Sequence, residues 1–282
     1  MRDDDNDAWD EGEPMRKRRW IVAFGLLFLG GMLCGVAFSS GLLLHETAPP
    51  ALGMGQAYTA RAHGPLSPLW NPAAIGDRPG LHGALAVSFS SEAEGALFAG
   101  GSLVGSQGLS FGLVVAQGKD AGQGGGTVAF RLLPGVFIGA GLASVTQTDS
   151  QGLSFNAGVL AQAETWSAGV GLYHLDGGIL GVDRPLLIRV GASFRVGDDS
   201  QVSVDLHLEA GEGEVALGVE TRVWALDLHW GASVSLHGEL SHTGLGIGFI
   251  LFGFPADLGI GFVGADQKLW ISLGVQGTVP LW

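Results

Sequence analysis

Seven side chains with acid–base or metal-binding chemistry share one face of three expected strands, 201–209, 214–223 and 226–236. They are Asp205, His207, Glu209, Glu220, Arg222, Asp227 and His229. Carboxylates and imidazoles could bind a metal ion or act as a general acid and base. The alternative is a solvated interior in which opposite charges face each other. We favour it, because neither a Gly-x-Ser-x-Gly nor a His-Glu-x-x-His motif is present, and we expect no enzymatic activity, no metal and no cofactor.

The elements that carry these residues have the alternation of β-strands. In the stretch 202–209, Val or Leu occupies every second position and Ser, Asp, His and Glu occupy the others. A period of two is the strand signature. Fourteen stretches of this kind follow residue 81. They are 82–90, 95–104, 107–117, 126–133, 136–146, 152–163, 165–175, 185–196, 201–209, 214–223, 226–236, 240–252, 256–263 and 268–279.

The number and spacing of the strands predict a transmembrane antiparallel β-barrel over 81–282. The segment supplies about 14 residues for each strand with its turn, and a tilted membrane-spanning strand needs about 9–11. The longest expected connections, 118–125 and 176–184, fall on the same outer side, as in bacterial outer-membrane barrels. The glycine-rich run from Gly122 to Thr127 begins in the first of these connections, and we expect it to be a loop rather than a phosphate-binding turn.

Composition fits an apolar exterior around a lumen of small residues. Hydrophobic residues make up 46% of the chain, charged residues only 15%, and there are 49 glycines. The net charge of −13 argues against nucleic acid as a partner. A transmembrane helix over the uncharged stretch 95–118 and a soluble β-sandwich or β-solenoid are the rival architectures. Seven glycines weaken the helix, and inward residues this small would make a poor dry core.

The first 40 residues have the pattern of an export signal. The basic run Arg16-Lys17-Arg18-Arg19 precedes an apolar segment from Trp20 to Leu44. The acidic stretch before Met15 fits this pattern poorly, so Met15 is a candidate for the true start. An uncleaved anchor is the alternative, because the apolar run is long enough to span a bilayer. Cys34, the only cysteine, follows Leu33 rather than the small residue of a lipid-attachment site.

Residues 41–80 are expected to form a separate, loop-like segment, since they hold six of the 11 prolines. This segment contains two motifs, Ala51-Leu52-Gly53-Met54-Gly55-Gln56-Ala57-Tyr58-Thr59-Ala60 and Leu69-Trp70-Asn71-Pro72-Ala73-Ala74. Together they resemble the N-terminal signature of the FadL-like outer-membrane barrels, including the PorV, PorQ and TraF-like branches. The close match covers about 25 residues. Gln56 and Ala74 stand where the family has glycine, and Arg61-Ala62-His63-Gly64 lacks the family's acidic pair.

The resemblance implies a fourteen-stranded barrel whose N-terminal segment folds into the bore as a hatch. The residues matching the hatch motif are Leu52, Gly53, Met54, Gly55, Trp70, Asn71, Pro72 and Ala73. Asn71 and Pro72 would shape the hatch through a side-chain turn and a fixed φ. The resemblance also implies that Trp282 is read by the barrel assembly machinery. From their places near strand ends, Trp166, Trp224 and Trp270 are candidates for the aromatic girdles of the membrane interface.

Three functions are compatible with such a barrel in the outer membrane of a Gram-negative-type bacterium. The first is passive transport of hydrophobic small molecules such as long-chain fatty acids, as the FadL branch implies. The second is a PorV-like barrel that docks or shuttles exported proteins in a secretion system. The third, a membrane-embedded enzyme, lacks adequate residues. The short outer loops argue against a faithful copy of the fatty-acid channel, but transport ranks first because the hatch motif and the glycine-rich bore fit passage through the wall.

Overall fold

The computed structural model describes residues 47–75, 79–118, 121–147, 150–176, 184–264 and 266–280. The expected signal segment 1–40, with Met15, and the terminal Trp282 lie outside the described residues. The alternating sequence forms fourteen antiparallel strands. They are β1 Gly80–Ser90, β2 Gly95–Val104, β3 Leu109–Gln117, β4 Ala121–Leu133, β5 Val136–Gln147, β6 Ser150–Gln162, β7 Trp166–Tyr173, β8 Leu187–Val196, β9 Ser200–Glu209, β10 Glu212–Val223, β11 Leu226–Ser235, β12 Leu240–Leu251, β13 Phe254–Val263 and β14 Lys268–Val279.

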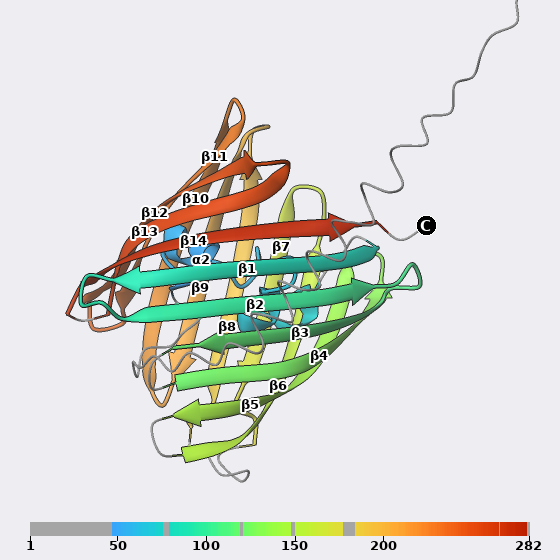
Figure 1. Cartoon of the computed structure of the whole chain (residues 1–282), viewed down its shortest axis with the longest axis horizontal. Helices are drawn as coiled ribbons and strands as arrows, with labels where there is room; N and C mark the ends of the chain where they lie inside the picture. The colour runs from blue at the N-terminus through green and yellow to red at the C-terminus, as the bar shows by residue number, and fades with distance from the viewer. Residues whose placement is uncertain are drawn as a thin grey trace, which may run out of the picture. The chain divides into compact units, whose positions relative to one another are not determined.

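Each strand pairs with its neighbours in the chain, and β1 pairs with β14 to close the barrel (Figure 1). The closing register runs from Leu81 opposite Val279 to Ser90 opposite Trp270. We call the end of the barrel where β1 begins and β14 ends the terminal end, and the opposite one the loop end. The longest connection, 174–186, lies at the loop end. The predicted fold class, an all-β antiparallel barrel of fourteen strands, is confirmed.

One expected loop is a strand. The glycine-rich run from Gly122 to Thr127 belongs to β4, which begins at Ala121. Its backbone pairs on both sides, with Gly124 opposite Val115 of β3 and Ser144 of β5. Glycine carries no side chain, so a run of glycines shows no alternation even when its backbone is part of a ladder. The prediction of a loop was wrong for that reason.

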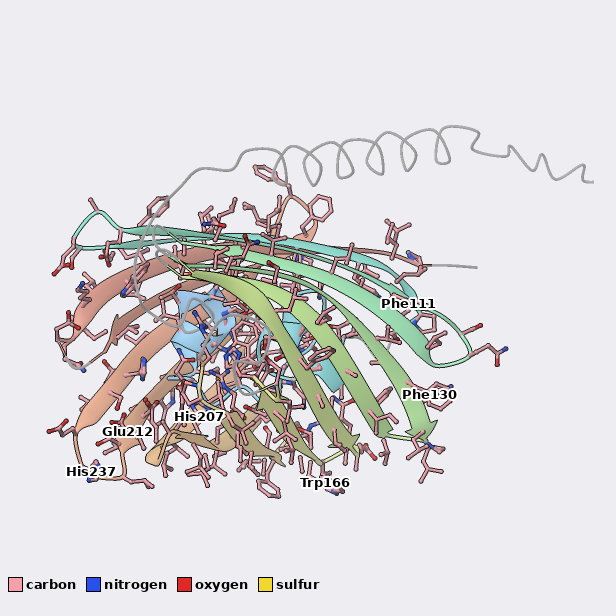
Figure 2. All side chains as sticks on the ribbon, turned by 90° about the horizontal axis from the view of Figure 1, so that it is seen from below. Phe111, Phe130, Trp166, His207, Glu212 and His237 are labelled. Carbon is pink, nitrogen blue, oxygen red and sulfur yellow. The ribbon has the colours of Figure 1, made fainter. Side chains whose placement is uncertain are left out.

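The barrel exposes large apolar side chains on its outer surface and keeps small polar ones inside. Phe111, Phe130 and Trp166 project outward (Figure 2) and are 49%, 44% and 43% exposed. Ser88 and Ser193, which lie on the inward face of their strands, are buried in the lumen. An apolar exterior around a polar interior is the arrangement of membrane barrels. No helix among the described residues is long and apolar enough to cross a membrane.

Trp270 does not belong to a girdle. It is 1% exposed and packs inside the barrel with Leu52 and Val263. Its neighbours Leu269 and Ile271 have the opposite parity, and Ile271 faces outward at 46% exposure. The expectation that Trp270 marks the membrane interface was therefore wrong. Trp224, by contrast, is 93% exposed in the turn between β10 and β11 at the terminal end.

The N-terminal segment occupies the lumen, as the blue ribbon around α2 shows inside the barrel (Figure 1). It contains the short helix α2 Pro49–Gly53 and the 3-10 turns η2 Ser67–Leu69 and η3 Pro72–Ala74. Each has a proline in its first turn, where the missing N–H leaves no donor unsatisfied. We call residues 47–75 the hatch, and nearly all of them are buried.

Lumenal glycines make room for the hatch. A β-carbon at Gly231 would overlap the Met54 carbonyl, one at Gly244 the Leu52 carbonyl, and one at Gly139 the Pro72 carbonyl. The same holds at Gly100, which faces Pro65. Several of the lumenal glycines thus form a surface that fits the hatch backbone.

Candidate functional site

The first motif of the hatch, Leu52 to Gly55, packs against the inner wall of the last strands. Leu52 and Met54 are each 1% exposed. Gly53 lies against Gly246 of β12, where an added β-carbon would be 3.1 Å from the Gly246 Cα. Gly55 has a left-handed φ of +56°, and its β-carbon would overlap the backbone of Ala232 in β11. Small size and conformational freedom are both required at Gly55.

The second motif, Trp70 to Ala73, forms the turn that the sequence suggested. Asn71 is the N-cap of η3: its side-chain Oδ1 accepts a hydrogen bond of 3.0 Å from the Ala73 N–H, and Pro72 follows at the first position. The Asn71 Nδ2 donates to the Val159 carbonyl of β6 at 3.0 Å. One asparagine therefore shapes the hatch and ties it to the wall.

Asp205 of β9 anchors the middle of the hatch. Its Oδ2 accepts hydrogen bonds from the backbone N–H groups of Tyr58 at 3.0 Å and Thr59 at 2.6 Å. The Asp205 side chain is fully buried, and His207 lies 3.7 Å away. A carboxylate that accepts two backbone N–H groups makes charge-assisted hydrogen bonds, which are stronger than neutral ones. Asp205, which the sequence predicts to face the lumen, thus makes a structural contact with the hatch.

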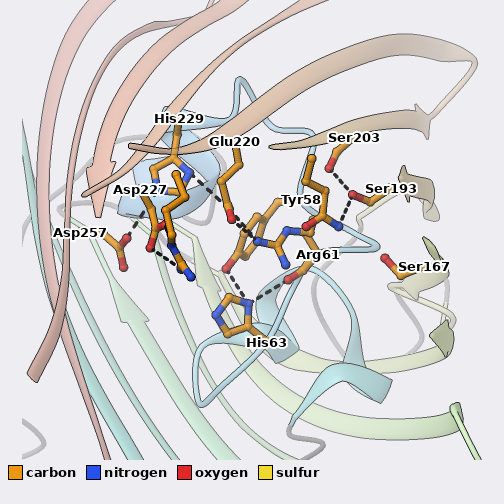
Figure 3. A network of polar contacts seen from close by, with 12 residues as sticks. Tyr58, Arg61, His63, Ser167, Ser193, Ser203, Glu220, Asp227, His229 and Asp257 are labelled. Carbon is orange, nitrogen blue, oxygen red and sulfur yellow. Dashed lines mark hydrogen bonds and ion pairs between the residues drawn. The ribbon is translucent and has the colours of Figure 1, made fainter. Parts of the chain in front are cut away.

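A second anchor is an ion pair between Arg61 of the hatch and Glu220 of β10. The Arg61 Nη2 donates to the Glu220 carboxylate at 2.6 Å, and both side chains are about one-fifth exposed. The register places Glu220 opposite His229, whose Nδ1 lies 3.5 Å from Glu220 Oε2. On its other side, His229 Nε2 lies 3.8 Å from Asp257 Oδ1 of β13. Figure 3 shows this row of side chains between hatch and wall.

The seven residues predicted to line the lumen lie at three different depths of the barrel. Glu220, Asp227 and His229 come together at the terminal end, where Arg222 pairs with Asp227 at 2.7 Å. Asp205 and His207 lie deeper, opposite Ala216 and Glu214. Glu209 stands at the loop end of β9, opposite Leu187 and Glu212. Among the described residues, no group of three or more His, Cys, Asp or Glu side chains is arranged to hold a metal ion.

Four further residues join the terminal-end cluster: Tyr58, Arg61 and His63 of the hatch, and Asp257 of β13. The Tyr58 ring meets Trp70 edge-on, with centroids 5.1 Å apart, and its hydroxyl lies 3.4 Å from His63 Nδ1. Burial raises the pKa of Tyr58, so the hydroxyl stays protonated. The hatch residues lie in an irregular segment without periodicity. Asp257 shares its strand's inward face, but its link to His229 appears only when the strand registers are known.

A cavity of about 830 Å³ opens beneath the hatch at the terminal end. We call it the chamber. Its polar lining includes the cluster just described. Its apolar lining comes from both the hatch and the wall: Pro49, Pro50, Pro65, Leu66, Trp70, Ala84 and Ala86. Small-molecule sites commonly have volumes of about 300–1,000 Å³ with mostly apolar walls and a few polar groups. The chamber has the size and lining of a ligand site.

Comparison with solved structures finds a similar barrel fold. No protein-family profile and no curated protein matches the chain in sequence. The structure titled CymD monoaromatic hydrocarbon channel is similar over 87% of this chain and 100% of that chain, with a TM-score of 0.62 and 13% identity. A mutant Rh. blastica porin gives a TM-score of 0.43 at 12% identity, covering 71% and 99% of the two chains. The KdgM porin gives 0.42 at 7% identity, covering 70% and 99%. At these identities the likeness concerns the fold.

Proposed function

We propose that this chain is an outer-membrane barrel for the passive transport of hydrophobic small molecules, and that it is FadL-like. The observation that carries the proposal is the hatch: both stretches of the family-like motif lie inside a closed fourteen-stranded barrel, above a chamber with apolar walls. A porin with an open bore needs no such segment. The fold likeness to CymD, titled a monoaromatic hydrocarbon channel, supports the same solute class.

The size of the solute is better matched by single-ring compounds than by long chains. Most connections at the loop end are short, such as 91–94, 210–211 and 236–239, so the described residues at that end offer little structure to build a groove for an extended acyl chain. The chamber itself has the volume of an ordinary small-molecule site. Long-chain fatty acids, which the resemblance implies, are therefore the second choice of substrate.

The test uses vesicles whose outer leaflet is lipopolysaccharide, because that leaflet slows the entry of hydrophobic compounds without a protein. We expect labelled toluene to enter vesicles that hold the purified barrel several-fold faster than empty vesicles, and a labelled long-chain fatty acid to show a smaller gain. Vesicles with heat-denatured barrel serve as the control. Equal rates with and without the barrel for both compounds would contradict the transport proposal.

The short loops also favour a second function, PorV-like docking of exported proteins, because low turns leave the rim of the barrel accessible to a protein. This function predicts that exported proteins co-purify with the barrel from its native membrane while hydrophobic solutes gain no entry. The vesicle experiment and the co-purification together separate the two functions.

A further inference from the structure

The charges around the chamber do not balance. Arg61 pairs with Glu220 at 2.6 Å, and Arg222 pairs with Asp227 at 2.7 Å. Asp257 is the fifth charged side chain of the lining, and no arginine or lysine of the described part of the chain is paired with it. Its nearest basic atom is the Nε2 of His229 at 3.8 Å. Two guanidinium groups therefore face three carboxylates.

Asp257 lies where a solute in the chamber would meet it. Its side chain is 23% exposed, whereas the neighbouring His229 is 8% exposed. The apolar wall formed by Trp70, Ala84 and Ala86 borders the same cavity. The Trp70 indole Nε1 is buried and has no hydrogen-bond partner among the described residues. A compound with an aromatic ring and an uncharged hydrogen-bonding group matches both parts of this lining.

We propose that the chamber is a binding site that selects uncharged aromatic compounds against carboxylates of the same size, with Asp257 as the residue that determines this specificity. The proposal rests on the transport function and narrows its substrate class. A bound carboxylate would stand close to the Asp257 carboxylate, which has no arginine or lysine partner among the described residues, in a space partly shielded from water. At a separation of about 8 Å and an effective dielectric constant near 20, such repulsion lowers affinity on the order of tenfold after screening by salt.

The experiment compares benzyl alcohol with benzoate, which share ring and size but differ in charge. Equilibrium dialysis against the full barrel in nanodiscs, corrected for binding to empty nanodiscs, gives both dissociation constants. We expect benzyl alcohol to bind the natural sequence at least about tenfold more tightly than benzoate. Asp257→Asn should raise the affinity for benzoate about 5- to 10-fold and leave that for benzyl alcohol within twofold.

Two further variants separate this effect from general charge and from fold. Asp198→Asn removes a carboxylate from an exposed turn at the same end of the barrel, outside the chamber, and should leave the ratio of the two affinities unchanged. Ala84→Leu adds volume to the chamber wall and should weaken the binding of both compounds. The unchanged affinity of Asp257→Asn for benzyl alcohol serves as the check that this variant is folded.

Three results would overturn the inference. The first is a ratio of affinities that Asp257→Asn leaves unaltered. The second is an equal change in that ratio with Asp198→Asn, and the third is undiminished binding in Ala84→Leu. Each can occur while toluene still enters the vesicles through the barrel. Failure of the selectivity is therefore distinct from failure of the transport function.

Discussion

Positive φ values mark the tightest part of the hatch. Gly55 and the next residue, Gln56, have φ values of +56° and +76°. The FadL-like motif has glycine at the position of Gln56, and the structure shows that this position is left-handed. Non-glycine residues pay roughly 1–2 kcal/mol in this conformation. Gln56 is buried as well, at 1% exposure, so the surrounding packing holds this non-glycine residue in a conformation that it disfavours.

Gly55→Ala is expected to destabilise the barrel more than the conformational penalty alone. The new methyl group would adopt an unfavourable φ and also overlap the backbone of Ala232. Gly197→Ala is the matched control, because Gly197 has a φ of +71° with nothing within 4 Å of an added β-carbon. Thermal unfolding in detergent should show a loss of about 1 kcal/mol for the control and about 1–3 kcal/mol more for Gly55→Ala. Equal losses would show that the hatch does not press on the wall here.

At the scale of the elements, the alternation of apolar and polar residues predicts the strands that show it. It fails in glycine-rich stretches, which have no side chains to alternate, and in irregular segments. The fourteen strands follow from Val, Leu, Ile and Phe at every second position. The start of β4 is missed, because Gly122 to Gly126 include four glycines and so carry almost no pattern. The inward position of Trp270 was available from parity, since Leu269 and Ile271 belong to the apolar set, but its place near a strand end suggested a girdle instead.

The candidate site was predictable only in part for the same reason. Glu220, Asp227 and His229 lie on regular strands, so their common face follows from parity. Arg61 and His63 lie in an irregular segment whose path depends on tertiary contacts with glycines of many strands. A sequence without alternation gives no direction to a side chain, and the ion pair of Arg61 with Glu220 spans a separation of 159 residues.

The connection after β7 contains a histidine whose protonation should weaken the barrel. Burial, and next the charge of Arg184, lower the pKa of His174 to about 4. Its Nδ1 lies 2.9 Å from the Ser154 hydroxyl, and its backbone N–H donates to Asn156 Oδ1 at 3.3 Å. In the unfolded chain the same imidazole titrates near 6.5. Between pH 6.5 and 4 the unfolded state therefore binds a proton that the folded state does not.

With respect to this group, the free energy of unfolding should be constant above pH 6.5 and should fall by roughly 1–2 kcal/mol as the pH drops toward 4. His174→Asn suits the positive φ of 60° at this position and carries no titrating group, so it should remove this part of the pH dependence. Thermal unfolding of both chains across pH 4–7 measures the difference. A side-chain NMR titration of His174 with a midpoint near 6.5 would contradict the assignment.

For the whole molecule, the hatch and the lumenal glycines form one fitted surface. Removing residues 47–75 should leave a bore lined by small residues, and a planar bilayer should then record a large, steady ion conductance that the full chain lacks. If the shortened chain does not fold, mild urea on the full chain should release the hatch and raise the conductance reversibly. A full chain that already conducts as strongly would show that the hatch does not obstruct the bore.

The fit also predicts that glycine substitutions depend on the hatch. Gly244→Ala should destabilise the full chain by about 1–3 kcal/mol, because its β-carbon overlaps the Leu52 carbonyl. Gly124→Ala, whose nearest neighbour is Val115 at 3.7 Å, should be tolerated. In a chain without the hatch, the two substitutions should become equivalent in thermal unfolding. A penalty for Gly244→Ala that persists without the hatch would place the clash within the wall.

β1 and β14, whose pairing closes the barrel, both contact the N-terminal segment. The Ser88 hydroxyl of β1 donates to the Thr47 carbonyl at 2.7 Å, and its oxygen lies 2.8 Å from the Ser272 hydroxyl of β14, which can donate to it. Pro49 of the hatch packs against Gly274 of β14, where an added β-carbon would be 3.1 Å from the Pro49 Cγ. The hatch, which precedes β1 in the chain, thus contacts both strands of the pair that closes the barrel. We expect the segment that obstructs the passage in the finished protein to guide these two edge strands together during assembly of the barrel.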